Sequence, residues 1–85
     1  MKIKDGYLLR RVADSYVALS VGTENEGRVV RMNGTGAFIW ELLNKETTEE
    51  AVVAALAQKY AIDTATAEKA AKDFIEMLRK EDLLA

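Results

Sequence analysis

The sequence predicts a small α+β domain in which a three-stranded antiparallel β-meander is followed by a winged-helix-like three-helix bundle. Three observations predict this fold class. The first third of the chain contains three strand candidates, and in the second of them apolar and polar residues alternate as they do in half-buried strands. A nearly all-apolar helical segment follows, and two amphipathic helical segments come after it. With 85 residues, the chain is long enough for one domain, expected over residues 1–85.

The strands are expected where β-branched and aromatic residues gather, at about residues 7–12, 16–21 and 28–32. In the second strand, Val17, Leu19 and Val21 recur at every second position, which is typical of a strand with one buried face. A polar loop bracketed by Gly22 and Gly27 leads to the third strand. Because short connections join all three, the first and third strands should lie at the two edges of the sheet.

The helices are expected at about residues 34–43, 48–60 and 64–81. Asn33 is the candidate N-cap of the first helix, and Asp63 is the candidate N-cap of the third. Thr47 and Glu50 have the spacing of a capping box at the start of the second helix. Each helix therefore has a recognisable start signal.

The core of the helical part should centre on the first helix, because a helix that is apolar on most sides must be covered on more than one side.

Gly36 near the start of the first helix is interpreted as allowing close approach to the sheet or to a neighbouring backbone. A phosphate-binding loop is disfavoured there, because the P-loop spacing and its lysine are missing. The core stripe of the last helix is predicted at Ala67, Ala71, Phe74 and Leu78, and the final Leu83-Leu84 pair is expected to fold back as an apolar tether.

The composition argues against catalysis and against metal or cofactor binding. The chain has no Cys and no His, so it lacks the commonest general base, the thiolate nucleophile and the preferred zinc ligands. A net charge of −2 disfavours a general nucleic-acid binder. No apolar run reaches membrane-spanning length, and no signal peptide is recognisable, so a cytoplasmic protein that does not contact the membrane is expected.

The third strand offers two interpretations. If it lies at an edge, its backbone N–H and C=O groups form a template for another strand. Arg28 and Arg31 can guard such an edge against aggregation, and taken alone these residues favour that interpretation. Alternatively, the two arginines attract an acidic extended peptide whose side chains pack on Val29 and on the last helix.

A longer pattern resembles a known family. The run VVRMNGTGAFIWELL, followed by TTEEAVVAALAQKYAID and DFIEMLRKEDLL, is similar to the PqqD-like family, whose members are also called RiPP recognition elements. This resemblance implies a non-catalytic peptide chaperone. Such a domain binds the leader segment of a ribosomally synthesised precursor peptide and presents it to a modifying enzyme, often a radical SAM enzyme. The chain departs from the family pattern at Met32 and Gly34, and at Asp82, where a glycine usually ends the last helix.

The resemblance also implies the location of the site. The leader is expected to add as a strand in the cleft between the third strand and the last helix. The expected contacts are the backbone of Arg28, Val29, Val30, Arg31 and Met32, a far wall of Ala70, Asp73, Phe74 and Met77, and a rim of Lys69 and Lys72. A winged-helix nucleic-acid binder or a structural subunit of a larger assembly is the alternative function. Pairing of the free edge with a second copy, giving a homodimer, is a further possibility.

Overall fold

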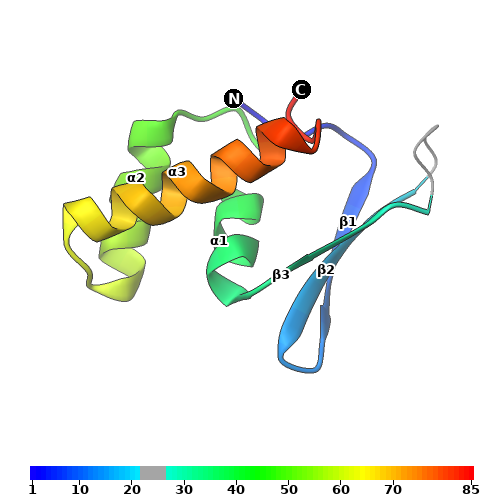
Figure 1. Ribbon diagram of the computed structural model, residues 1–85, viewed down its shortest axis with the longest axis horizontal. Helices are drawn as coiled ribbons and strands as arrows, with labels where there is room; N and C mark the ends of the chain where they lie inside the picture. Colours follow the sequence, from blue (N-terminus) through cyan, green and yellow to red (C-terminus); the bar gives the residue numbers. More distant parts are fainter. Residues whose placement is uncertain (22–26) are drawn as a thin grey trace.

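The computed structural model describes residues 1–21 and 27–85 and has the α+β architecture expected from the sequence (Figure 1). The element order is three strands followed by three helices: β1 (Tyr7–Val12), β2 (Ser15–Ser20), β3 (Val29–Met32), α1 (Gly34–Leu42), α2 (Glu49–Tyr60) and α3 (Thr64–Lys80). The polar loop expected after β2 lies outside the described residues, except for Gly27. The predicted fold class is confirmed.

The sheet is an antiparallel meander with the strand order β1-β2-β3, so that β1 and β3 are its edges. The β1–β2 turn is one residue shorter than expected. Ala13 has a left-handed backbone (φ 55°), which allows a tight two-residue turn, and Ser15 therefore already pairs with Val12. As a result β2 begins and ends one residue before the predicted strand. The strand β3 begins at Val29, one residue after the predicted start.

One face of the sheet packs against the helices, as Figure 1 shows. Apart from the exposed Arg11, the strand side chains of this inner face are buried or half-buried, and they are Tyr7, Leu9, Tyr16, Ala18, Ser20, Val30 and Met32. The helix α1 lies at the centre of the molecule, with Ile39 and Trp40 almost fully buried. The Tyr7 and Trp40 rings meet edge to face, with centroids 5.6 Å apart, and tie β1 to α1. The expectation that α1 is covered on more than one side is confirmed.

The helix α3 buries a stripe that differs from the predicted one in a single residue. Its buried residues are Ala67, Ala71, Ile75 and Leu78. Ile75, and not Phe74, occupies the third position of this stripe. The helix is therefore rotated slightly from the orientation that the apolar spacing predicted, and Phe74 is only half-buried. This rotation moves the Phe74 ring from the core to the surface beside β3.

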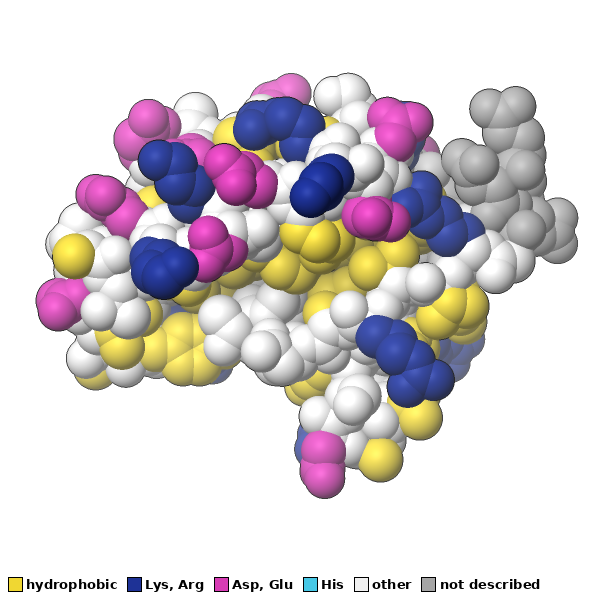
Figure 2. Space-filling model, viewed as in Figure 1, with side chains coloured by type: hydrophobic (Ala, Val, Ile, Leu, Met, Phe, Trp, Pro, Cys, Tyr) yellow, Lys and Arg dark blue, Asp and Glu magenta, His cyan; other side chains and the backbone are white. Residues whose placement is uncertain are grey.

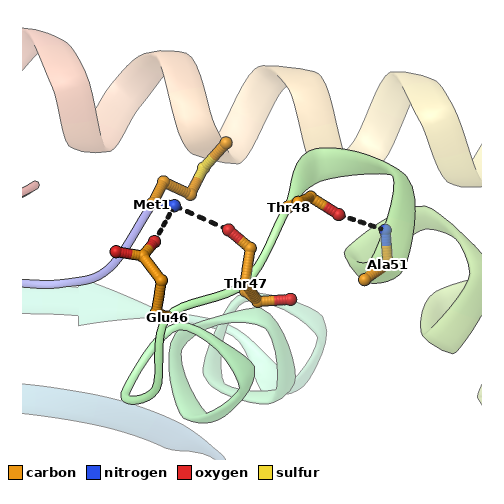
Figure 3. A network of polar contacts seen from close by, with 5 residues as sticks. All are labelled: Met1, Glu46, Thr47, Thr48 and Ala51. Carbon is orange, nitrogen blue, oxygen red and sulfur yellow. Dashed lines mark hydrogen bonds and ion pairs between the residues drawn. The ribbon is translucent and has the colours of Figure 1, made fainter.

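The helix α2 begins one residue later than the predicted capping box (Figure 3). The Thr48 hydroxyl accepts a hydrogen bond from the Ala51 amide at 3.2 Å, so Thr48 and not Thr47 is the N-cap. Thr47 is held outside the helix by the start of the chain, because its amide donates to the Met1 carbonyl and its carbonyl accepts from the Met1 ammonium at 2.6 Å. With Thr48 as the cap, Ala51 occupies the position where a capping box needs Glu or Gln.

The Met1 ammonium also pairs with the Glu46 carboxylate, as Figure 3 shows. A hydrogen bond from this ammonium and its positive charge lower the pKa of Glu46 from its ordinary value. These contacts join the first residue to the α1–α2 connection.

The two ends of the described chain lie next to each other (Figure 1). The Ile3 amide donates to the carbonyl of Leu43, and the Lys4 amide donates to the carbonyl of Leu83 at 2.9 Å. Ile3 also forms an isolated β-bridge with Leu84. Because Leu83 is fully buried, the last residues act as the apolar tether that the sequence predicts.

Candidate functional site

The open side of β3 is the first component of the candidate site. The backbone amide of Ser20 donates a hydrogen bond to the Arg28 carbonyl at 3.1 Å. Ser20 and Arg28 are therefore a hydrogen-bonded pair of the β2–β3 ladder. Hydrogen-bonded pairs alternate along an antiparallel ladder, so the backbone groups of Val30 and Met32 also point toward β2. The N–H and C=O groups of Val29 and Arg31 consequently point away from β2. In the part of the chain that the structure describes, no strand lies on that side.

The second component is an open groove of about 420 Å³ beside this edge. Its residues come from the end of β3, the first turns of α1 and one flank of α3. They are Arg31, Met32, Asn33, Thr35, Gly36, Ile39, Ala70, Asp73, Phe74 and Met77. Figure 2 shows apolar surface exposed below the charged ridge of α3. The groove therefore runs beside a strand edge with free hydrogen-bonding groups.

The floor of the groove is apolar and closely packed. Ile39 and Met32 are buried beneath it, whereas Phe74 is half-buried and forms part of its wall. A Cβ atom at Gly36 would lie 2.8 Å from Phe74 Cε1 and 3.1 Å from Met32 Cβ. The Phe74 ring can thus lie against the start of α1 only because residue 36 has no side chain. The close approach to the sheet that we expected at Gly36 is confirmed.

Asn33 sets the direction in which α1 leaves the sheet. Its backbone is extended (φ −87°, ψ −177°), and its side-chain oxygen accepts a hydrogen bond from the Gly36 amide at 2.8 Å. Asn33 is therefore the N-cap of α1, as predicted. Because the cap directly follows Met32, the helix begins without a loop and its first turn closes one end of the groove.

Charged residues lie around the groove in pairs. Lys69 and Asp73, one turn apart on α3, form an exposed ion pair of 2.9 Å. Arg28 and Glu81 form a second pair of 3.0 Å that connects the start of β3 to the end of α3. Arg31 is exposed, and no ion pair of its guanidinium is found in the described part of the chain. Arg31 is accordingly available to an acidic ligand at this strand edge, and its side chain belongs to the face of the sheet opposite the helices.

The structure brings together most of the residues that the sequence placed in the site. The expected residues that line the groove are Arg31, Met32, Ala70, Asp73, Phe74 and Met77. Both lysines expected at the rim, Lys69 and Lys72, line a separate depression, to which Asp73 also contributes. Val29 and Val30 contribute backbone and sheet surface next to the groove, and Arg28 is paired with Glu81.

Four lining residues were not among the expected ones: Asn33, Thr35, Gly36 and Ile39. A sequence signal for them exists, because they directly follow the edge strand and lie in the first turns of α1.

Among the described residues there is no group of three or more His, Cys, Asp or Glu side chains that could hold a metal ion. Within that same part of the chain, none of the helices has the length and apolar character needed to cross a membrane.

Comparison with known proteins gives two matches. The family described as "Coenzyme PQQ synthesis protein D (PqqD)" matches residues 15–84. A solved structure described as "TbiB1 in Complex with the TbiA(beta) Leader Peptide" is 31% identical in sequence and has a TM-score of 0.76. That alignment covers 99% of this chain and 94% of the other. No match is found among curated proteins.

Proposed function

This chain belongs to the PqqD family, and on that basis we propose that it is a recognition element that binds the leader segment of a ribosomally synthesised precursor peptide. The observation that carries the proposal is the open edge of β3 beside an apolar groove. The similar TbiB1 structure, which holds a leader peptide, supports it. The leader adds as a fourth strand and pairs with the outward N–H and C=O groups of Val29 and Arg31.

The register of β3 divides the leader side chains into two sets. Leader residues opposite Val30 and Met32 direct their side chains to the helix side of the sheet, toward Phe74 and Met77. Leader residues opposite Val29 and Arg31 direct theirs to the other side. We therefore expect apolar residues at alternate positions of the bound segment, with an acidic residue near Arg31.

Backbone pairing alone does not give tight binding. Val29 and Arg31 together offer two donors and two acceptors, and each hydrogen bond contributes a net of about 0.5–1.5 kcal/mol. Their sum of roughly 2–6 kcal/mol is below the approximately 8 kcal/mol of a micromolar complex. Apolar side chains in the groove must supply the remainder. The strand edge and the groove therefore both contribute to the affinity, and the backbone pairing also orients the peptide.

The proposal extends to how the bound peptide is used. We propose that the chain itself catalyses no reaction and needs no cofactor, and that it presents the precursor to a modifying enzyme of the radical SAM type. Support comes from the family and from a sequence without Cys or His. We place this step in the cytoplasm, where the precursor is synthesised. The comparisons give no support to the nucleic-acid or structural-subunit alternative.

An NMR titration of the 15N-labelled protein with the leader peptide tests the proposal. We expect the amides of Val29 and Arg31 to shift at micromolar peptide, together with those of Phe74 and Met77. A scrambled peptide of the same composition is the control. Unchanged Val29 and Arg31 amides at saturating leader would contradict strand addition at this edge. Light scattering of the free protein tests whether the same edge joins two copies instead.

A further inference from the structure

The outer face of the sheet, opposite the helices, carries exposed apolar side chains. Leu8, Val12 and Val29 are 42%, 56% and 52% exposed, and Leu19 is partly exposed between its neighbours. The register aligns Leu8, Leu19 and Val29 in one row across all three strands. Large apolar residues normally avoid water when they lie side by side, so a continuous row of this kind indicates a contact surface.

A second row of the same face is basic. Arg10, Val17 and Arg31 lie side by side across the sheet, next to the apolar row. The strand residues of this face include two arginines and no acidic residue, although the whole chain has a net charge of −2. A partner that covers the face therefore needs an apolar centre and carboxylates that can pair with two guanidinium groups.

The proposed leader strand would enlarge the same face. Leader residues opposite Val29 and Arg31 direct their side chains outward, so each of the two rows would gain a fourth member, which in the second row is the acidic residue expected beside Arg31. A partner seated there would contact the protein and the bound leader together. Without a bound leader, the outer face would offer the partner only the part of this surface that the protein itself supplies.

We propose that the outer face of the sheet is the docking surface for the modifying enzyme, which covers it with an apolar patch flanked by Asp or Glu residues. This inference rests on the proposed function. A second copy of this chain fits the face less well, because packing the face against itself would bring arginines together without any carboxylate from its strands. The enzyme instead meets both rows with complementary groups and contacts the peptide that it modifies.

Two substitutions on β1 separate enzyme docking from leader binding, because β1 is two strands away from the open edge. Leu8→Lys places a charge in the apolar row, and Arg10→Glu reverses a charge in the basic row. Arg11→Glu is the matched control, since it makes the same charge change at the next residue, whose side chain belongs to the opposite face. Leu8 and Arg10 are exposed, so neither substitution disturbs the core.

The test uses the full chain, the purified modifying enzyme encoded beside it, and the leader peptide of the adjacent precursor, with calorimetry for each pair. Leu8→Lys and Arg10→Glu should each weaken enzyme binding by about tenfold or more and leave leader affinity within about twofold, whereas Arg11→Glu changes neither. Leader should also tighten enzyme binding to the wild-type chain.

Several results would overturn the docking surface. They are wild-type enzyme affinity in both outer-face variants, an equal loss in Arg11→Glu, no enzyme binding by the wild-type chain, or a wild-type dimer in light scattering that the outer-face variants dissociate. Failure of the proposed function has a different signature, namely no leader binding by the wild-type chain. In that case the enzyme titration without peptide still tests whether the enzyme binds the outer face.

Discussion

Replacing Val29 with proline tests the open edge of β3, because the substitution removes the N–H group that points away from β2. Among residues 1–21 and 27–85, no hydrogen-bond acceptor for this N–H is found, and the Val29 side chain is 52% exposed. We therefore expect Val29→Pro to fold. Proline is tolerated at a strand edge when the missing donor faces solvent.

The effect on leader binding follows from the lost pairing. One hydrogen bond worth about 0.5–1.5 kcal/mol disappears, and the leader carbonyl that it served is left buried without a donor at a cost of about 1–3 kcal/mol. A total of roughly 1.5–4.5 kcal/mol corresponds to about 10-fold to 2,000-fold weaker binding. Calorimetry with the leader peptide measures this ratio.

Val30→Pro is the matched control at the next residue. The Val30 N–H points toward Ala18 in the β2–β3 ladder, so this substitution removes a ladder hydrogen bond and leaves its acceptor unsatisfied, at a cost of about 1–3 kcal/mol of folding free energy. Urea unfolding of both variants provides the comparison. Wild-type leader affinity in Val29→Pro would refute pairing at this residue, and equal destabilisation of the two variants would refute the assigned register.

Three further substitutions have defined outcomes. Gly36→Ala should displace the Phe74 ring and weaken leader binding measured by calorimetry, while the gain of about 1 kcal/mol in helix propensity partly offsets an overpacking cost of about 1–3 kcal/mol. Glu81→Gln should release Arg28 from its exposed ion pair and tighten binding of an acidic leader by a few fold, with little change in stability. Ala61→Gly should raise the free energy of unfolding in urea by about 0.5–1 kcal/mol, because residue 61 has a left-handed backbone (φ 52°) at the end of α2.

Each of these expectations has a clear contrary result. Unchanged leader affinity in Gly36→Ala would mean that the Phe74 ring is not part of the leader contact. Weaker leader binding in Glu81→Gln would indicate that Glu81 itself contacts the peptide. For the helix end, Ala54→Gly in the exposed middle of α2 is the control, and it should destabilise by about 1 kcal/mol. A loss of stability in Ala61→Gly as well would refute the strain argument.

The elements were predictable from the sequence because their signals are local. Alternation identified the second strand, and Asn33 and Asp63 each accept the backbone hydrogen bond expected of an N-cap. The exception among the caps is Thr48, which replaces Thr47 because the backbone of Thr47 is hydrogen-bonded to Met1 at the start of the chain. That contact joins residues far apart in the sequence, and no local pattern encodes it.

The candidate site was predictable only in part, because it depends on how α3 is rotated. Ala70, Phe74 and Met77 were placed in the cleft from a family resemblance, and they do line the groove. Lys72 does not, and the apolar spacing alone assigned Phe74 to the core stripe that Ile75 occupies. A rotation by a fraction of a helical turn separates these alternatives, and it is fixed by packing against α1 and α2 that the sequence does not show.

Because β3 is short, only a short segment of a precursor peptide can pair with it. Four strand residues at about 3.3 Å each extend over roughly 13 Å, which is a small part of an extended peptide. Backbone pairing with β3 therefore constrains only a short segment of the leader.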